Sequence, residues 1–233
     1  GFDGGDGGPA RNASFLGVHA VACAPNGDVY VGDSGGRLRV IEEGGDGRIR
    51  TVAGVGIPGW SGDGGPADRA RIGTPAAIAF DARGTIYFAD LTQHVVRRID
   101  TDGVIHTVAG SGQAGYSADG TVATAARLHR PLGIAVGADG TVYVADARNN
   151  RVRAITRSGV METVAGCDAG GDTAGPVAAT DARLNEPRGL WLQGDVLLIC
   201  DHYNIRGKAV RRTDAGRLWQ RELAVRRGLR PWC

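Results

Sequence analysis

The sequence predicts an all-β protein, a β-propeller built from four-stranded antiparallel blades. The first observation is a Thr-Val-Ala-Gly sequence that recurs at a constant spacing of 56 residues, at 51–54, 107–110 and 163–166. The second is an aspartate that closes an apolar run at nearly the same period, at Asp33, Asp90, Asp146 and Asp201. A long fixed period is the signature of a repeat architecture. Four repeats of about 56 residues fill nearly all of the 233-residue chain.

The third repeat shows most clearly what each unit folds into. Short apolar or alternating runs at 132–136, 141–146, 151–155 and 160–165 are rich in β-branched residues, which is typical of strands. Turn sequences separate the first three runs at 137–140 and 147–150, and Ser158-Gly159 separates the last two. Four short strands joined in sequence by tight turns predict an antiparallel meander, which is one propeller blade.

The same pattern places the other blades and the connections between them. The predicted propeller spans residues 1–225, with blades at about 18–54, 75–110, 131–166 and 187–223, and residues 226–233 form a tail that matches no repeat element. The fourth blade is the loosest match, above all in its outer strand. Each linker reads as a glycine turn, one helical turn that carries Ala and Leu or Ile inward, and a Pro that ends the helix.

Composition limits the classes of function. Apolar residues make up 42% of the chain, enough for a folded core, so disorder is not expected. The net charge of +2 argues against a whole-protein role on nucleic acid, and no apolar run approaches the roughly 18 residues of a membrane span. Four cysteines without a CxxC pair are interpreted as buried free thiols, with a disulfide as the alternative.

Five motifs recur in the repeats, with their clearest copies as follows: Gly-Asp-Gly-Gly-Pro-Ala at 62–67, Pro-Leu-Gly-Ile-Ala-Val at 131–136, Val-Tyr-Val-Ala-Asp at 142–146, Asn-Asn-Arg-Val-Arg at 149–153 and Thr-Val-Ala-Gly at 163–166. In these motifs the repeats resemble NHL repeats of the bacterial kind, which are also similar to the propeller of teneurin-like proteins. The resemblance implies a propeller, commonly six-bladed, that binds proteins or sometimes RNA. It also implies that a few relatives are enzymes, such as amidating lyases with histidine-bound zinc and gluconolactonase-like hydrolases.

The number of repeats leaves two architectures open. Four blades form either a closed four-bladed ring or a segment of a larger propeller. Gly1 aligns with Pro58, in the middle of a linker, which favours the segment. An incomplete ring leaves the apolar faces of its end blades uncovered, so a homo-oligomer is then an expectation.

Periodic polar residues are interpreted as structural. The four aspartates could form a carboxylate ring for a cation, but a residue present in every blade more often binds backbone N–H groups in a turn. Arg71, Arg127 and Arg183 recur at spacings of 56 residues. They could form a ring that binds anions, but we expect them to tie each linker to a neighbouring blade. The glycine-aspartate turns lack the oxygen-ligand spacing of a calcium loop.

Residues that break the period are the candidate binding positions. A Pro opens three of the inner strands and Val18 opens the first, and the residue that follows differs in every repeat. A variable rim beside a constant frame is where a propeller can encode its partner. Exposed loop aromatics add the side chains favoured in binding hot spots. The predicted ligand-binding rim positions are His19, Trp60, Tyr116, Leu132, Arg188, His202 and Tyr203.

Function is predicted from the pattern as a whole. We expect a non-catalytic recognition scaffold that binds a protein or other ligand through its rim loops, as a module of a larger extracellular or cell-envelope protein. No catalytic residue, metal ligand or cofactor is predicted, because the sequence has no GxSxG, HExxH or P-loop. The alternative is a metal-assisted lyase or lactone hydrolase with its site in the central channel, holding zinc or calcium.

RNA binding is a weaker third reading. Arginines on the third strands could form a basic face, at Arg97, Arg98, Arg151, Arg153, Arg211 and Arg212. Binding should instead use a loop-rich face, so a nucleic-acid partner is not expected.

Overall fold

The computed structural model describes residues 4–44, 47–173, 177–212 and 218–222 of the chain. These residues form four separate antiparallel sheets, each made of four strands in sequence order. Blade 1 contains β1 (Val18–Cys23), β2 (Val29–Asp33), β3 (Arg37–Ile41) and β4 (Ile49–Ala53). Blade 2 contains β5 (Pro75–Phe80), β6 (Ile86–Asp90), β7 (Val95–Ile99) and β8 (Ile105–Ala109). Blade 3 contains β9 (Pro131–Val136), β10 (Val142–Asp146), β11 (Arg151–Ile155) and β12 (Met161–Ala165). Blade 4 contains β13 (Pro187–Gln193), β14 (Val196–Asp201), β15 (Arg206–Arg212) and β16 (Leu218–Glu222).

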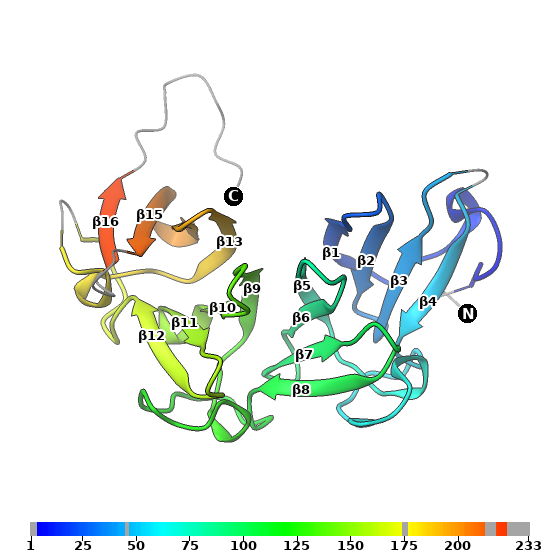
Figure 1. Cartoon of the computed structure of the whole chain (residues 1–233), viewed down its shortest axis with the longest axis horizontal. Helices are drawn as coiled ribbons and strands as arrows, with labels where there is room; N and C mark the ends of the chain where they lie inside the picture. Colours follow the sequence, from blue (N-terminus) through cyan, green and yellow to red (C-terminus); the bar gives the residue numbers. More distant parts are fainter. Residues whose placement is uncertain (1–3, 45–46, 174–176, 213–217, 223–233) are drawn as a thin grey trace.

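The blades lie along an arc around a common centre, as a propeller requires (Figure 1). The first strands of successive blades contact one another, β1 with β5, β5 with β9 and β9 with β13. The fourth strands lie at the periphery. The all-β propeller prediction is confirmed. Among the described strands no hydrogen-bonded pairing joins one blade to another. The four blades are therefore not closed into a ring by strand pairing. The predicted tail, residues 226–233, lies outside the described residues.

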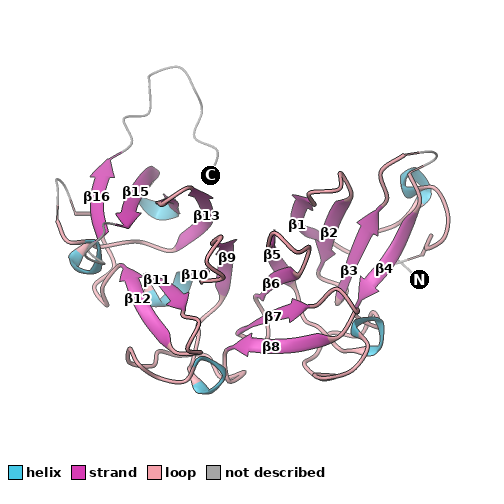
Figure 2. Cartoon of the chain, in the orientation of Figure 1, coloured by secondary structure: helices cyan, strands magenta, loops and turns pink. Residues whose placement is uncertain are grey.

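Short 3₁₀ helices mark the connections (Figure 2). The linkers contain η1 (Ala10–Asn12), η2 (Ala67–Arg69), η3 (Ala123–Ala125) and η5 (Ala179–Asp181). In the three inter-blade linkers, the first alanine of each helix, the alanine that follows the helix and the apolar residue five positions after the helix start are buried, which confirms the inward helical turn: Ala67, Ala70, Ile72, Ala123, Ala126, Leu128, Ala179, Ala182 and Leu184. Two more, η4 (Ala147–Asn149) and η6 (His202–Asn204), lie in the turns between second and third strands of blades 3 and 4.

The glycine of each Thr-Val-Ala-Gly sequence has a steric reason. Gly54, Gly110 and Gly166 have φ values of 91°, 95° and 90°, a conformation that L side chains rarely adopt. A Cβ at Gly110 would lie 2.4 Å from the carbonyl oxygen of His94. The Gly110 N–H also donates to the carbonyl of Ala123, the first residue of η3. The recurring glycine therefore lets the outer strand pass close to the blade's own turn and into the linker.

The core is divided into three clusters, one between each pair of adjacent blades. The cluster between blades 2 and 3, for example, packs Val96 and Tyr87 against Ile134 and Val144, with Leu128 of the linker between them. Alternate residues of an inner strand face opposite neighbours, because side chains alternate along a strand. Burial of this apolar surface is the main force that holds one blade to the next.

The two ends of the arc expose residues that internal blades bury. Ile134 in β9 faces blade 2 and is 5% exposed, whereas Val21, at the same repeat position in β1, is 62% exposed. Ala135 faces blade 4 and is 6% exposed, whereas Trp191, at the same repeat position in β13, is 65% exposed. Blades 1 and 4 therefore each present an uncovered apolar edge.

The cysteines differ from the prediction of buried free thiols. Cys200 is disulfide-bonded. Cys23 and Cys167 are free, but Cys23 is exposed and Cys167 is only partly buried. Cys23 is solvent-accessible because it lies on the uncovered side of β1, where its counterparts Phe80 and Val136 pack against a preceding blade.

Candidate recognition surface

The four periodic aspartates are structural in this fold. All four side chains are 0% exposed. Asp90 accepts hydrogen bonds from the backbone N–H groups of Gly73, Thr74 and Gln93. Asp146 accepts from the His129 N–H at 2.7 Å and from the Asn149 amide at 2.7 Å. Each aspartate thus fixes the turn after its strand and, in blades 2 to 4, the end of the incoming linker, rather than contributing to a ring for a cation.

Buried cations on the third strands hold the linkers. Arg39, Arg97, Arg153 and Lys208 occupy one repeat position and are at most 1% exposed. Arg97 donates to the carbonyls of Arg71 at 2.9 Å and Ser61 at 3.1 Å, and it pairs with Asp63. Lys208 makes the equivalent bond to the Arg183 carbonyl at 3.0 Å. Two of the arginines considered for RNA binding, Arg97 and Arg153, are therefore inside the protein.

The prediction that each linker is tied to a neighbouring blade by Arg71, Arg127 or Arg183 was wrong. Their side chains are exposed and lie against Gly59, Gly115 and Gly171 of their own linkers. In the described structure no side-chain hydrogen bond or ion pair is recorded for them. The tie to the blade comes from the third-strand cation, which binds the backbone carbonyl of Arg71 or Arg183 in two linkers and that of Ser117 in the linker before blade 3. The linker arginine side chain is therefore not needed for it.

Trp60 and Tyr116 occupy one repeat position and attach linkers to the following blade. The Trp60 indole N–H donates to Thr107 Oγ1 in β8 at 2.9 Å. The Tyr116 ring lies 4.3 Å below the guanidinium of Arg151 and 5.0 Å from that of Arg153. They remain 39% and 44% exposed. The structure does not bring these two predicted positions together with the other five.

The other predicted positions lie on the side where the inner strands begin. There the start of each first strand pairs with the end of the second, for example Pro187 with Asp201. Arg188, His202 and Tyr203 come together: the Arg188 guanidinium lies 5.7 Å from the Tyr203 ring, which meets the His202 ring at 4.9 Å. Leu132 is half-buried on blade 3 and His19 is exposed on blade 1. We call this side of the propeller the rim face.

Sequence reasoning missed most of what surrounds Arg188. Arg148 Nε lies 2.7 Å from Glu186 Oε1, and Arg188 Nη2 lies 3.0 Å from Glu186 Oε2. On the blade 2 side, the rings of His94 and His129 meet edge to face at 5.8 Å. His94 therefore lies on the rim face. We define the basic rim as His94, His129, Arg130, Arg148, Glu186, Arg188, His202 and Tyr203.

Two interblade hydrogen bonds fix the basic rim. His94 Nδ1 accepts from the backbone N–H of Arg130 at 3.1 Å, and Asn150 Oδ1 accepts from the N–H of Glu186 at 3.0 Å. His94 and Asn150 share a repeat position and both have positive φ, at 58° and 52°. Their side chains accept from the residue that precedes the Pro of the next blade. Blade 1 has Gly36 at this position and blade 4 has Ile205.

Burial and neighbouring charges shift the pKa values of titrating groups on the rim face. The pKa of His94 is lowered by burial first, then by His129 and Arg130. The pKa of His129 is lowered by burial first, then by Arg148 and Arg130. Beneath them, burial raises the pKa of Asp146 to about 6. The imidazoles thus lie in a locally positive field that disfavours a further positive charge.

Comparison with known sequences decides the family. The family model described as Teneurin NHL domain matches residues 58–118 and 113–179, which is more than half of the chain. The chain belongs to the teneurin NHL domain family. It is 30% identical to Teneurin-m of Drosophila melanogaster over 173 residues, which is 68% of this chain and 6% of that protein. It is 38% identical to human Teneurin-1 over 111 residues, which is 45% of this chain and 4% of that protein. The chain therefore spans only a small part of these relatives.

Solved structures confirm the fold of this NHL domain at low sequence identity. An auxiliary nutrient binding protein from Bacteroides thetaiotaomicron superposes with a TM-score of 0.60 at 19% identity, covering 89% of this chain and 48% of that one. A gluconolactonase from Xanthomonas campestris gives 0.60 at 16%, covering 89% and 62%. Virginiamycin B lyase from Staphylococcus aureus gives 0.54 at 17%, covering 90% and 57%. At these identities the likeness shows the fold alone.

The centre of this NHL domain is apolar. A cavity of about 690 Å³ is lined by the second halves of all four inner strands, including Val21, Ile78, Ile134 and Trp191. Cys23 supplies the one thiol in this lining. Within the described residues no group of three or more His, Cys, Asp or Glu side chains is arranged to hold a metal ion, and no described helix is long and apolar enough to cross a membrane.

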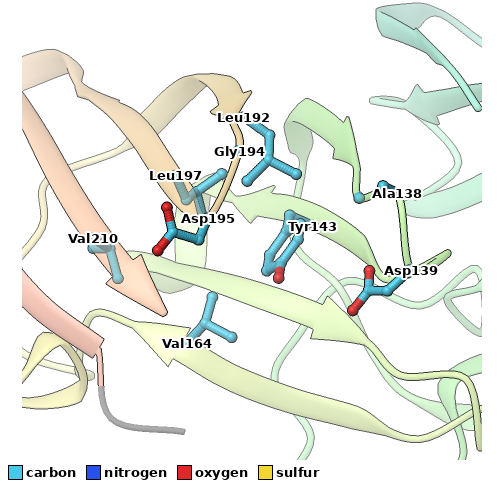
Figure 3. A pocket seen from close by; sticks show the side chains of 10 residues that line it. Ala138, Asp139, Tyr143, Val164, Leu192, Gly194, Asp195, Leu197 and Val210 are labelled. Atoms are coloured by element: carbon cyan, nitrogen blue, oxygen red, sulfur yellow. The ribbon is translucent and has the colours of Figure 1, made fainter. Parts of the chain in front are cut away.

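A smaller pocket of about 240 Å³ opens between blades 3 and 4, on the side opposite the rim face (Figure 3). Its walls include Val164, Leu192 and Val210, and the Tyr143 ring lies between the carboxylates of Asp139 and Asp195. Asp139 already accepts from the N–H and hydroxyl groups of Thr141, at 3.1 and 3.0 Å. Asp139 therefore fixes the turn that leads into β10.

Proposed function

We propose that this NHL domain is a protein-recognition module that binds its partner through the rim face, as part of a larger extracellular or cell-envelope protein. One observation carries the proposal. The polar residues that repeat in every blade, the second-strand aspartates and the third-strand cations, are buried and bind turns and linkers. In contrast, Arg188, His202 and Tyr203, which break the repeat, gather on the rim face beside Arg148 of the neighbouring blade. Propeller loops on a rigid frame are suited to recognition. Membership of the teneurin family supports the proteinaceous partner and the location.

Site-specific photocrosslinking tests the proposal. A benzophenone amino acid replaces Tyr203, which is 57% exposed on the rim face, or Val122, which is equally exposed in a linker. The matched exposure makes the linker position a control for nonspecific capture. We expect a discrete protein adduct, in cells that express the full-length protein, only from position 203. Equal adducts from both positions would contradict a rim-face partner.

The enzymatic alternative stays a prediction and is separated from recognition by a direct assay. The purified protein, incubated with zinc or calcium, is tested for opening of simple aldonolactones and for amide-releasing lyase activity. Turnover that depends on the metal and is unaffected by rim-face substitutions would assign the function to the central channel. Absence of turnover together with a rim-specific adduct is the outcome that we expect.

A further inference from the structure

The basic rim contains two arginines held side by side by one buried carboxylate. Arg148 comes from η4 of blade 3, whereas Glu186 and Arg188 flank Pro187 at the start of blade 4. Each oxygen of Glu186 pairs with a different guanidinium, at 2.7 and 3.0 Å. The Glu186 side chain is 8% exposed, but those of Arg148 and Arg188 are 49% and 42% exposed. The carboxylate thus lies beneath, and the two guanidiniums reach solvent.

Each guanidinium keeps donors for a second carboxylate. A guanidinium has five N–H donors in a fixed planar arrangement. Glu186 contacts Nε of Arg148 and Nη2 of Arg188, and Arg188 Nε is buried, so the donors that face a ligand are on the terminal Nη nitrogens. Because Glu186 neutralises only one of the two arginine charges, the three side chains together carry a net positive charge. The planar guanidinium is suited to bidentate binding of a planar carboxylate.

The surroundings add positive charge and little that opposes it. Arg130 is exposed one blade step away, and no ion pair is recorded for its side chain in the described structure. The nearby aspartates of this side, Asp146 and Asp201, are 0% exposed and are used by turn N–H and amide groups. The lowered pKa values of His94 and His129 agree with a positive local field.

The cluster of Arg148, Glu186 and Arg188 is also ordered before any partner binds. Glu186 has a φ of 49°, held by the hydrogen bond from its N–H to Asn150 Oδ1. Arg188 lies over the Tyr203 ring at 5.7 Å, within the range of a cation–π contact. Side chains ordered in this way lose less entropy when a ligand binds.

We infer that the partner docks on the basic rim through a segment rich in aspartate or glutamate, whose carboxylates bind Arg148 and Arg188 while Arg130 contributes attraction at longer range. This inference rests on the proposed recognition function and specifies its chemistry. A nucleic acid is the less suitable occupant. Its backbone is bound by an extended basic patch or stripe, whereas two of the third-strand arginines that could extend this one, Arg97 and Arg153, are buried.

Fluorescence anisotropy on the full chain tests the inference with defined probes. The probe is a fluorescein-labelled ten-residue peptide of alternating Asp and Glu, and the matched peptide has Asn and Gln instead. We expect binding of the acidic peptide alone, weakening as salt rises because exposed charges are screened. The double variant Arg148→Gln/Arg188→Gln should weaken binding by about tenfold or more, since both charge-assisted contacts to the acidic peptide are removed.

A charge-matched control separates local contacts from net charge. Arg71→Gln/Arg127→Gln removes the same two charges from exposed linker positions, and we expect it to change the affinity less than twofold. Equal losses in the two double variants would overturn the inference. So would tighter binding of a labelled ten-nucleotide oligothymidine than of the acidic peptide.

Folding and the underlying function are checked separately. Circular dichroism establishes that each variant is folded. The single variant Arg130→Gln, at an exposed residue, gives a second reading, with a smaller loss that disappears at high salt. If Tyr203 crosslinks a protein but the acidic peptide does not bind, the recognition function stands and the acidic partner is wrong.

Discussion

At the scale of single residues, buried ionisable groups are the most sensitive reporters of this fold. Asp146 is 0% exposed, and burial is the largest influence on its pKa, which it raises. The hydrogen bonds from Asn149 and His129 and the nearby charges of Arg153 and Arg151 lower the pKa by less. Its pKa is raised to about 6, from 3.8 for an isolated aspartate. The folded state therefore binds this proton more tightly than the unfolded state does.

The stability of the protein should consequently depend on pH through Asp146. Its contribution is fully present below about pH 4 and is lost as pH rises through 6, because ionisation is disfavoured only in the folded state. We expect the free energy of unfolding of the native protein, relative to Asp146→Asn, to fall by about 2–3 kcal/mol between pH 4 and 7, at about 1.4 kcal/mol per pKa unit. Urea unfolding at four pH values measures it.

The comparison with Asp146→Asn removes other titrations from the result. His94 and His129 have lowered pKa values and destabilise the fold as pH falls, but they contribute equally to both proteins. A difference between the two proteins that stays constant from pH 4 to 7 would contradict the raised pKa.

Single residues also show what the sequence could not reveal. Arg97 and Arg71 both recur with the repeat, and their positions alone do not distinguish a buried guanidinium from an exposed one. Alternation in β7 would place Arg97 and Arg98 on opposite faces, and burial of one of them depends on the linker that folds over it. The cluster of Arg148, Glu186 and Arg188 joins residues about 40 positions apart, so no local motif encodes it.

At the scale of elements, the third-strand cations explain how a linker with few apolar residues stays attached. Replacing Arg97 with Ala removes the guanidinium donor from the carbonyls of Arg71 and Ser61 and the ion-pair partner from Asp63. We expect Arg97→Ala to lower the unfolding free energy by about 2–4 kcal/mol, because hydrogen bonds from a buried charged donor are lost while Asp63, whose side chain is 44% exposed, stays hydrated. Arg71→Ala, at an exposed side chain, should cost within about 0.5 kcal/mol.

Chemical denaturation of the two variants decides between the linker and the strand arginine. Equal destabilisation would restore the sequence-based assignment of the tie to Arg71. Arg97→Lys is a useful intermediate, because Lys208 performs the same role in blade 4 with one bond to the Arg183 carbonyl and contacts to Asp172 and Asp201. It should retain part of the stability that Arg97→Ala loses.

The elements themselves were largely predictable. Strand positions, turns and inward linker residues follow from local propensity and a repeated pattern, and each repeat supplies an independent reading of the same unit. The rim face was predictable only as a location. Which side chains meet there depends on the rotation between blades, which the sequence does not encode locally. Trp60 and Tyr116 show the limit, because exposure and aromatic character were right but the rim placement was not.

The Thr-Val-Ala-Gly element gives a prediction with an internal control. Gly110 and Gly84 both have positive φ, at 95° and 87°. A methyl group at Gly84 meets nothing within 4 Å, but at Gly110 it lies 2.4 Å from the His94 carbonyl oxygen. We expect Gly84→Ala to cost about 1 kcal/mol, the conformational penalty alone. Gly110→Ala should cost at least twice as much, because backbone must move.

Thermal unfolding followed by calorimetry measures both variants. A 2 kcal/mol loss lowers the Tm by roughly 4–8 °C in a protein of this size. If Gly84→Ala and Gly110→Ala destabilise equally, the close approach of the outer strand to the turn is not a determinant of this repeat.

At the scale of the whole molecule, the two ends of the arc are the side of blade 4 that would face a next blade, its trailing side, and the side of blade 1 that would face a preceding blade, its leading side. Three times within the chain, the trailing side of one blade packs against the leading side of the next, through the three apolar clusters. Blade 4 presents a trailing side with Trp191 at 65% exposure, and blade 1 presents a leading side with Val21 at 62%. Uncovered apolar surface of this sort marks an interaction site.

The purified chain is therefore expected to associate with a second copy, trailing side to leading side. Trp191→Ser should weaken this association at least tenfold, because removing a central aromatic from an interface typically costs 2 kcal/mol or more. It should change the stability of the monomer within about 0.5 kcal/mol, since the side chain is largely in solvent. Sedimentation velocity across a hundredfold range of concentration measures the association.

Trp60→Ser is the matched control, because it removes the same side chain from a linker where the indole bonds Thr107. It should reduce stability and leave self-association unchanged. A head-to-tail contact between unlike faces can continue beyond two copies unless the rotation closes a ring, so the distribution of sedimenting species reports the geometry. If Trp191→Ser sediments like the native protein at every concentration, the uncovered edge of blade 4 is not where copies of this chain meet.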